Sequence, residues 1–386
     1  MSDSHSLTAD AITATVTEMK EYGGWLELSR SALLHNLAGV RRLVEPAQVM
    51  AVVKANAYGA GAAAIAGVLQ DAGVTRFAVA TVDEAIALRE AGIGGDILCL
   101  TYFDRSDAAA IRHHELTVTV CSDSGVSTLS AIAREAGARL RLWVKVDTGL
   151  GRLGVPVERA AEFIAGILRD TSLEATGIYS TLTESRERDR QQLARLLELR
   201  QRLPAGIDAT WSLASSHAVL TLPESCLDIV RPGVMLLGFP PGEAERMNAH
   251  RVAIADPRSV VTWKTRIAGI KTLPAGEQAG YGEQPPLAAN TRVASLMVGW
   301  SDGYPGSPQQ RSCVLIDERR CRVLALSANT TLVDVTAAGS AKAGHQAVLL
   351  GRSKHVEIGV EELARAGDGV YRMLARIPAR VPRIWS

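Results

Sequence analysis

Short apolar runs recur between residues 30 and 240, each about as long as a buried β-strand. Helix-period segments lie between most of them, for example at residues 83–92, 158–170 and 188–203. Alternation of strand and helix predicts parallel strands, and eight such units can close into a (β/α)8 TIM-type barrel. The eight runs are VMAVVK (49–54), RFAVAT (76–81), DILCLT (96–101), LTVTVC (116–121), RLWVKV (141–146), ATGIYS (175–180), ATWSLA (209–214) and DIVRPG (228–233).

An open doubly wound sheet is the alternative to a barrel. Such sheets, when they bind dinucleotides, carry a G-x-G-x-x-G turn after the first strand. The residues that follow the first apolar run read ANAYGAG and do not have that sequence. The barrel is therefore the preferred fold.

The pattern changes after residue 250. Short β-rich runs are separated by Gly and Pro turns, with one helix-like piece, GVEELARAG, near the end. Such spacing is typical of an all-β domain. We therefore expect an N-terminal extension (1–24), a barrel domain (25–245) and a C-terminal all-β domain (246–386).

Composition and charge narrow the class of protein. The 386 residues are 47% hydrophobic but only 4% aromatic, as in a globular α/β protein. The 42 basic and 41 acidic side chains nearly balance, which argues against nucleic acid as a partner and favours a small molecule. No apolar run is long enough to cross a membrane, and the first 22 residues lack the pattern of a secretion signal, so a cytoplasmic protein is expected.

Chemically useful residues occur where the predicted strands end. In a barrel these positions meet at one face, which is where active sites form. Hydroxyls and glycine amides after the seventh and eighth strands are typical of a phosphate site. The residues are Lys54, Tyr58, Lys145, Arg152, Thr181, Ser215, Ser216, Arg231, Gly233 and Val234.

Lys54 follows four apolar residues at the end of the first strand. A lysine that faces a phosphate site across a barrel mouth suggests a Schiff base with pyridoxal phosphate (PLP), because the amine must reach the cofactor's aldehyde carbon. An ordinary salt bridge at the barrel mouth is the alternative, and spacing alone leaves it open.

Several motifs resemble those of the alanine racemase family, in order and spacing, from Trp25 to the C-terminus. They are VVKANAYGAG, VKVDTGLGRLG, DIVRPGVMLLG, AGYGEQ, VGWSDGYPG and ARVPRIW. The resemblance implies a PLP-binding barrel with a β domain, onto which the first short strand, WLEL, packs. It also implies a homodimer with shared active sites and the interconversion of L- and D-amino acids.

The resemblance also implies roles for single residues. Lys54 would carry PLP, and Tyr281 would reach in from the other subunit as the second base. Arg152, held by Lys145, would contact the phenolic oxygen and the substrate carboxylate. Arg231 would face the pyridine nitrogen, where related decarboxylases place a glutamate. The residues that would hold the phosphate are Tyr58, Ser216, Gly233, Val234 and Tyr371.

By this resemblance the chain would be a divergent member, because it departs from the family's pattern at several positions. Thr181 stands where the family has a histidine that packs on the cofactor, and Arg186 stands for an acidic residue. Trp300, Ala328 and Asn329 occupy positions expected to contact substrate. Further departures are Ser215 for an asparagine, Trp300 for a tyrosine, Gly306 and Ala325 for arginines, Ala328 for a methionine and Asn329 for an aspartate.

These departures have two interpretations. The altered entrance admits an amino acid other than alanine, because pocket volume and charge decide specificity, or the protein is a paralogue that binds PLP without turnover. A lyase-type PLP enzyme on the same scaffold is a further alternative. His217 is either a substitute for the missing imidazole or a donor near the phosphate.

No metal site is expected. His345, His355, Cys313 and Cys321 lack clear ligand spacing. The five cysteines form no C-x-x-C pair and are expected to be buried thiols. The sequence therefore predicts a PLP enzyme without a metal.

Overall fold

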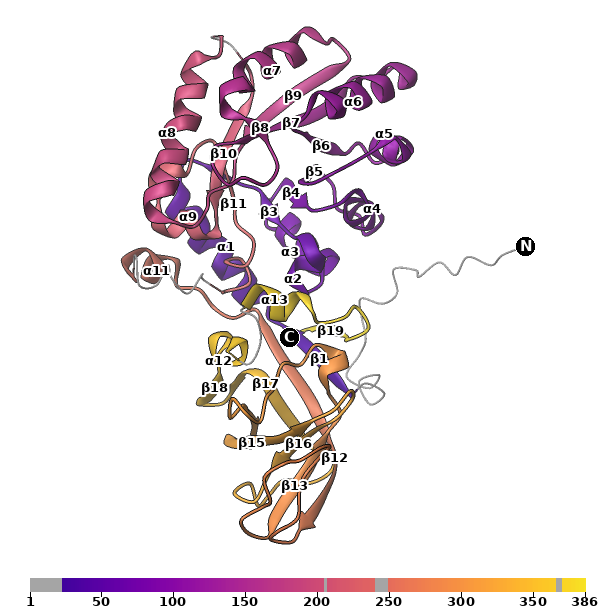
Figure 1. The fold of residues 1–386 in the computed structure, drawn as a ribbon, viewed down its shortest axis with the longest axis vertical. Coiled ribbons are helices and arrows are strands. Elements are labelled where there is room, and N and C mark those ends of the chain that lie inside the picture. Colours follow the sequence, from indigo (N-terminus) through magenta and orange to yellow (C-terminus); the bar gives the residue numbers. More distant parts are fainter. Residues whose placement is uncertain (1–22, 205–206, 240–248, 366–369) are drawn as a thin grey trace, which may run out of the picture. The chain divides into compact units, whose positions relative to one another are not determined.

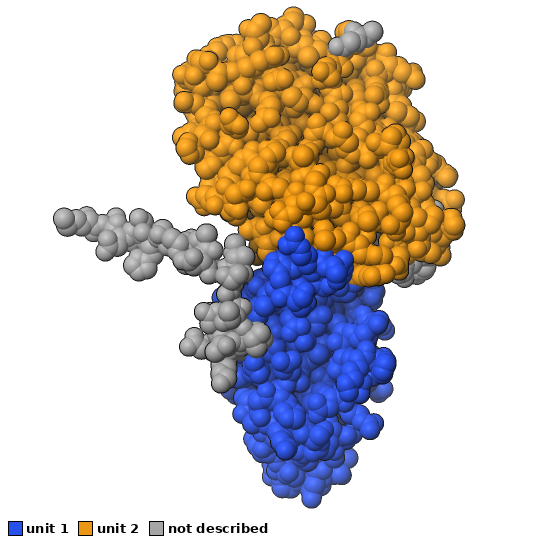
Figure 2. All heavy atoms as spheres, turned by 180° about the vertical axis from the view of Figure 1, so that it is seen from behind, with its two compact units in different colours: residues 1–32, 58–61, 259–386 blue, residues 33–57, 62–258 orange. Residues whose placement is uncertain are grey.

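The computed structural model describes residues 23–204, 207–239, 249–365 and 370–386. The chain forms two compact units, one of residues 33–57 and 62–258 and the other of residues 1–32, 58–61 and 259–386 (Figure 2). The expected boundary near residue 245 falls in residues 240–248, which lie outside the described residues. The same is true of most of the expected N-terminal extension.

Parallel strands form the centre of the first unit. Each pairs with its neighbour in the order β2-β11-β10-β9-β7-β6-β5-β4-β3, and β8 (Val155–Pro156) adds a short pairing to β7. The strands are β2 (Gln48–Val49), β3 (Ala51–Val52), β4 (Arg76–Val79), β5 (Asp96–Cys99), β6 (Thr117–Val120), β7 (Leu140–Asp147), β9 (Leu173–Tyr179), β10 (Thr210–Ser215) and β11 (Ile229–Arg231).

The ring of strands closes at residues 48–52. β2 pairs with β11, and β3 pairs with β4. Only Met50 separates β2 from β3 along the chain. The Met50 amide donates to the Val230 carbonyl at 2.9 Å, which continues the pairing across the interruption. Taken as one strand, residues 48–52 complete the eight strands expected from the sequence, and the barrel is confirmed.

Helices alternate with these strands and surround them (Figure 1). Those expected at residues 83–92, 158–170 and 188–203 are confirmed as α4, α7 and α8. The helices are α1 (Arg30–Val44), α3 (Ala62–Asp71), α4 (Val82–Glu90), α5 (Ala108–His113), α6 (Asp123–Ala136), α7 (Val157–Arg169), α8 (Arg186–Arg202), α9 (Ser216–Thr221) and α11 (Ala249–Ala255), with short 3-10 turns η3 (Arg105–Asp107) and η4 (Pro223–Ser225).

The barrel core includes two aromatic side chains on neighbouring strands. Trp143 of β7 and Tyr179 of β9 are both buried, with ring centroids 6.0 Å apart in an edge-to-face arrangement. Gly177 of β9 makes room for the indole, because a Cβ there would lie 2.2 Å from Trp143 ring carbons. A side chain at residue 177 would therefore overpack the core.

Gly177→Ala is expected to lower the free energy of unfolding by about 2 kcal/mol or more, because the barrel fixes the positions of both β9, which carries residue 177, and β7, which carries Trp143. Denaturant unfolding measures the change. Gly166→Ala in α7 is the matched control, since a Cβ at that half-buried helical position would meet only an Arg169 nitrogen at 3.8 Å. The control should leave stability unchanged or raise it slightly. Equal effects of the two substitutions would contradict the packing argument.

The second unit is built on one mostly antiparallel sheet, in the order β18-β17-β14-β15-β16-β13-β12-β1-β19. β12 also pairs with β17, so the sheet folds back on itself. Its strands are β1 (Gly24–Leu28), β12 (Val261–Leu273), β13 (Thr291–Leu296), β14 (Cys313–Ile316), β15 (Arg319–Leu326), β16 (Thr331–Asp334), β17 (Gln346–Ser353), β18 (Val356–Ile358) and β19 (Arg383–Trp385). The expected all-β domain is confirmed, and the helix-like piece near its end forms α12 (Val360–Ala364).

β1, the first strand among the described residues, belongs to this β sheet. β1 pairs antiparallel with β12 and parallel with β19, and Lys264 Nζ lies 2.7 Å from Glu27 Oε2 across the first of these pairings. The packing expected for WLEL is thus confirmed. Within the described residues, no helix is long and apolar enough to span a bilayer.

Candidate functional site

Most of the residues singled out in the barrel sequence lie at the carboxyl ends of its strands. Lys54 follows β3 by one residue, Lys145 is near the end of β7, and Arg231 is the last residue of β11. Thr181 follows β9, and Ser216 begins α9 directly after β10. The fold therefore gathers these groups at one end of the parallel strands.

The backbone after Lys54 turns in the left-handed sense. Ala55, Asn56 and Ala57 have φ values of 52°, 54° and 50°. Such a run is strained for residues with a Cβ, by roughly 1–2 kcal/mol each. Glu84 offsets part of this cost, because its carboxylate accepts from the Ala55 amide at 2.5 Å and from the Ala80 amide at 2.7 Å. Strain of this kind is concentrated at functional sites.

Four cations influence one another at this end of the barrel. Burial lowers the pKa of Lys54, and the charges of Arg152 and Arg231 lower it further, while Glu84 acts in the opposite direction. Burial lowers the pKa of Lys145 to about 8, with Arg152 and Arg231 adding to the effect. Like charges gathered in this way are stabilised by an anionic ligand.

Arg231 is 6% exposed and is held by hydrogen bonds from its guanidinium. It donates to Ser212 Oγ and, at 2.7 Å, to the Ser180 carbonyl. The guanidinium carbon lies 4.8 Å from the centre of the Tyr179 ring, and Lys145 Nζ lies 5.3 Å from the same ring. Burial lowers the pKa of Arg231 to about 10, so it stays charged at neutral pH.

Ser216 joins the residues after β10 and β11. Its hydroxyl oxygen accepts from the Gly233 amide at 2.9 Å and from the Met235 amide at 3.4 Å. The Gly233 amide is thus engaged within the chain, whereas the hydroxyl hydrogen of Ser216 remains able to donate to an anion. Val234 follows in the same buried segment.

The Arg152 loop follows β7. Asp147 closes the start of this loop, because its carboxylate accepts from the amides of Gly149, Leu150 and Gly151. Burial opposes the charge on Asp147, but these donors and Lys145 hold its pKa below the usual value. Arg152 itself is exposed. Arg152 and Lys145 are both cations, so their charges repel each other. The hydrogen bonds that Asp147 accepts from the loop amides account for the shape of the loop.

Lys145 has a testable effect on stability. In the unfolded chain its pKa is near 10.5. Below about pH 8 the lysine is charged in both states, so folding bears the full cost of burying the charge. Between about 8 and 10.5 the folded protein binds fewer protons than the unfolded chain, and the cost disappears as pH rises.

Lys145→Met is therefore expected to raise the free energy of unfolding of cofactor-free protein at pH 7 by roughly 1–3 kcal/mol. The gain should shrink as pH rises above about 8. Denaturant midpoints across this pH range measure it, and Lys342→Met at an exposed position is the control. A gain that grew with pH would contradict the prediction.

His217, the candidate for a substitute imidazole, is buried in α9, and its Nε2 has no hydrogen-bond partner among the described residues. Tyr58 continues the left-handed turn with a φ of 52°. Tyr371 lies in α13 (Val370–Ala375), and its side chain is outside the described part of the chain.

Among the described residues, no group of three or more His, Cys, Asp or Glu side chains could hold a metal ion.

The second unit presents Tyr281 and Trp300 at its surface, 83% and 62% exposed. Trp300 begins the short 3-10 turn η5 (Trp300–Asp302), which is bound to the segment containing Ala328. The Trp300 amide donates to the Ser327 carbonyl at 3.1 Å, and the Ser301 amide donates to the Ala328 carbonyl at 2.9 Å. These backbone hydrogen bonds thus fix the position of Trp300, although its ring is exposed and does not pack in the core.

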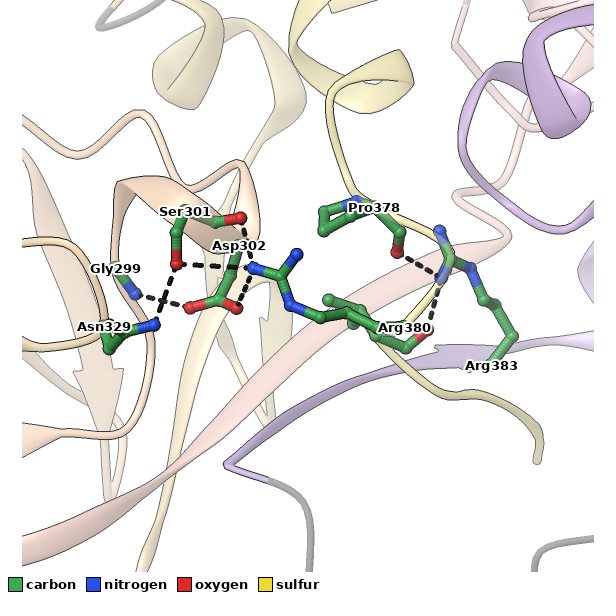
Figure 3. A network of polar contacts seen from close by, with 8 residues as sticks. Gly299, Ser301, Asp302, Asn329, Pro378, Arg380 and Arg383 are labelled. Carbon is green, nitrogen blue, oxygen red and sulfur yellow. Dashed lines mark hydrogen bonds and ion pairs between the residues drawn. The ribbon is translucent and has the colours of Figure 1, made fainter.

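Side chains reinforce this turn (Figure 3). Asn329 donates to Ser301 Oγ at 2.9 Å, and Arg380 donates to Asp302 Oδ1 at 3.0 Å and to the Ser301 carbonyl. Asp302 Oδ2 accepts from the Gly299 amide at 2.9 Å. Asn329 therefore binds its neighbours within the β unit, a role that the sequence pattern did not predict.

Ala325 supports the loop that carries Tyr281. It is 7% exposed, and a Cβ on Gly280 would lie 2.3 Å from the Ala325 methyl group. Gly280 has a φ of +94°, which also favours glycine. A large side chain at residue 325 would displace this loop, so Ala325 and Gly280 are matched in size.

The residues after the barrel strands fit PLP. The cofactor is an aldehyde with an anionic phosphate, and the site offers a lysine with a lowered pKa among further cations. A lowered pKa raises the fraction of neutral amine, the form that attacks an aldehyde. The Ser216 hydroxyl provides a donor for the phosphate.

Two residues with a part in this geometry were missed by the sequence analysis. Glu84 holds the strained turn after Lys54, and Tyr179 lies beneath two cations. Glu84 is recognisable only as an acidic residue in the first turn of a helix, a common position on electrostatic grounds. Tyr179 is recognisable only as an aromatic residue of a buried strand.

Comparison with known proteins gives one family along the chain. Residues 28–241 match the family profile "Alanine racemase, N-terminal domain", and residues 260–385 match "Alanine racemase, C-terminal domain". The alanine racemase of Desulforamulus reducens is 34% identical over 373 residues, which cover 94% of this chain and 98% of that protein. That of Carboxydothermus hydrogenoformans is 34% identical over 370 residues, covering 94% and 99%.

Solved structures agree with this assignment. The crystal structure of alanine racemase from D-cycloserine producing Streptomyces lavendulae has a TM-score of 0.85 and 30% identity, covering 94% of this chain and 97% of that one. A structure of alanine racemase from E. faecalis has a TM-score of 0.85 and 25% identity, covering 95% and 99%. The likeness therefore extends over both units.

Proposed function

Because the chain belongs to the alanine racemase family, we propose that it is a PLP-dependent racemase that interconverts the L and D forms of a small amino acid, with alanine the first substrate to test. The observation that carries this proposal is the half-buried Lys54 amine, whose pKa is lowered beside Arg152 and Arg231. An amine with a lowered pKa next to two cations suits an aldehyde cofactor and a carboxylate substrate.

When bound, PLP supplies an electron sink that stabilises negative charge on the substrate Cα. Lys54 is the residue that would bond to its aldehyde carbon. Ser216, with Tyr58, Gly233, Val234 and Tyr371, would hold the phosphate. Thr181 would lie beside the cofactor without stacking on it, because it has no ring.

The chain's own residues account for binding and proton transfer. Arg152 would bind the substrate carboxylate as a charge-assisted pair. Lys54 and Tyr281 would act as the two bases, since inversion needs a proton removed from one face of Cα and returned to the other. Arg231 has donors only, so it would donate a hydrogen bond to an unprotonated pyridine nitrogen but could not accept one from a protonated nitrogen, and it therefore favours the unprotonated ring. This limits the electron sink and, with it, side reactions of the carbanion.

A homodimer with shared sites is part of the proposal. Tyr281 and Trp300 are exposed on the β unit, together with Met297 at 45%. Large exposed apolar groups of this kind are enriched in protein interfaces. Tyr281 would act in the partner's barrel, and Trp300, Ala328 and Asn329 would line the substrate pocket there.

Exchange of the Cα hydrogen in heavy water tests the function. The PLP-loaded protein is incubated with L- and D-alanine and with a panel of other amino acids, and proton NMR and chiral analysis follow exchange and inversion. Exchange with inversion is expected for alanine. Inversion of a different amino acid alone would assign another substrate. Release of an aldehyde, ammonia or carbon dioxide without inversion would replace the proposal with a lyase.

A further inference from the structure

Helix α8 (Arg186–Arg202) buries polar side chains on the face that meets the barrel. Gln192 is 1% exposed and Asp189 is 2% exposed. Burial of an amide or a carboxylate costs free energy unless each is hydrogen-bonded. The partners of these side chains therefore show why polar residues occupy a helix face that apolar ones could fill.

The Gln192 amide joins two loops at the mouth of the barrel. Its Nε2 donates to Thr148 Oγ1 at 3.2 Å and to the Thr181 carbonyl at 3.0 Å. Its Oε1 accepts from the Thr183 amide at 3.0 Å. Thr148 begins the Arg152 loop, while Thr181 and Thr183 belong to the loop after β9, so one side chain fixes both.

Neighbouring groups strengthen this connection. Thr148 Oγ1 and Ser180 Oγ are 2.8 Å apart, and Asp189 Oδ1 accepts from the Thr183 amide at 2.9 Å. Arg195 donates to the Thr148 carbonyl at 2.9 Å, and Arg188 donates to the Gly149 carbonyl at 2.8 Å.

The Arg152 loop also packs closely on α8. A Cβ on Gly149, whose φ is +138°, would come within 3.2 Å of an Arg195 nitrogen and 3.5 Å of Gln192 Cγ. Residue 149 is therefore restricted to glycine both by its backbone conformation and by the helix. The loop has little room to move away from α8 or toward it.

We infer that Gln192 is a positioning residue that holds the Arg152 loop and the Thr181 loop in a fixed relation, and so sets where the substrate carboxylate binds. The inference rests on the proposed function, in which Arg152 binds that carboxylate. A shift of the loop weakens a charge-assisted contact, because such contacts depend on distance and alignment. Within the described residues, no buried side-chain nitrogen or oxygen of this network lacks a hydrogen-bond partner, which is the condition under which buried polar groups make a structure rigid.

Gln192→Glu tests the inference, because it keeps an acceptor for Thr183 and loses the donor to Thr148 and Thr181. The expected result is a KM for the amino acid raised about tenfold, because the Arg152 loop loses its hydrogen bonds to residue 192, with a much smaller change in kcat. Hydrogen exchange should become faster in peptides covering residues 147–152 and 180–184, with and without substrate. Gln191→Glu is the matched control, since it places the same charge on the exposed neighbouring residue.

A double-mutant cycle shows whether the effect runs through Arg152. In an Arg152→Lys background, Gln192→Glu should raise KM far less than in the wild type, because the contact it positions is already impaired. Additive effects, equal effects of Gln191→Glu, or unchanged exchange in both loops would overturn the inference.

Thr148→Val gives a second readout if Gln192→Glu folds poorly. It removes the hydroxyl that contacts both Gln192 and Ser180 and keeps the volume, so faster exchange is expected at residues 147–152 and, more weakly, at residues 180–184. Unchanged exchange in both loops would overturn the connection through Thr148 and Gln192. If the wild-type protein exchanged no Cα hydrogen, the proposed function would fail, while the loop measurements would still support or overturn the connection through Gln192.

Discussion

Lys54→Ala is expected to reduce racemisation by about a thousandfold or more, because it removes both the attachment point of the cofactor and one of the two proposed bases. Lys54 is half-buried at the end of β3, and its pKa is lowered by burial and by Arg152 and Arg231. Alanine cannot replace a nucleophilic amine. Chiral analysis of alanine over time measures the loss.

A chemical readout separates this loss from misfolding. Borohydride treatment of the wild-type protein with PLP should attach the cofactor covalently to the peptide that contains Lys54, as shown by mass spectrometry. The Lys54→Ala protein should give no labelled peptide while keeping its circular dichroism spectrum. Labelling of Lys145 instead, or racemisation within tenfold of the wild type, would show that Lys54 is not the attachment point.

Tyr281→Phe is expected to slow racemisation by about 10²–10⁴-fold, the usual range for a lost acid–base group. The phenolic hydroxyl is removed from a side chain that is 83% exposed in the single chain, so the folding of each subunit should not change. Lys54 would still act on one face of Cα. One enantiomer should therefore exchange its Cα hydrogen with retention, which proton NMR in heavy water detects.

Tyr102→Phe is the control for this substitution. Tyr102 is 74% exposed and lies after β5, and the proposed function gives it no role. Unchanged turnover is expected. If Tyr281→Phe racemised as fast as the control, the second base would have to be another residue. The next to test is His217, whose Nε2 has no hydrogen-bond partner among the described residues.

Mixing the two inactive proteins tests whether the sites are shared. Random exchange of subunits would form hybrid dimers that contain one Lys54→Ala chain and one Tyr281→Phe chain. In each hybrid, one of the two sites would have both Lys54 and Tyr281, and the other would have neither. About a quarter of wild-type activity should then return, since half of the dimers are hybrids. No recovery after subunit exchange would mean that Lys54 and Tyr281 serve a site within one chain.

The strand and helix order of the barrel and the β character of the second unit could be predicted from the amino-acid pattern alone. Both follow from local periodicity. A parallel strand that is buried on two faces is mostly apolar, as in Phe77–Val79 of β4, whereas the helices between strands need only one apolar face. The sequence also placed Lys54, Arg152 and Arg231 at strand ends, because the barrel assigns those positions to one face.

Tertiary structure decided the contacts between segments far apart in the chain. Glu84 binds the turn after Lys54, and Gln192 joins the loops that follow β7 and β9. The sequence suggested that Ala325 and Asn329 belong to the substrate entrance. In the structure Ala325 packs against Gly280, and Asn329 donates a hydrogen bond to Ser301. Periodicity reports which face of an element is buried but not what it is buried against, so partners of this kind are set only when the barrel and the sheet close.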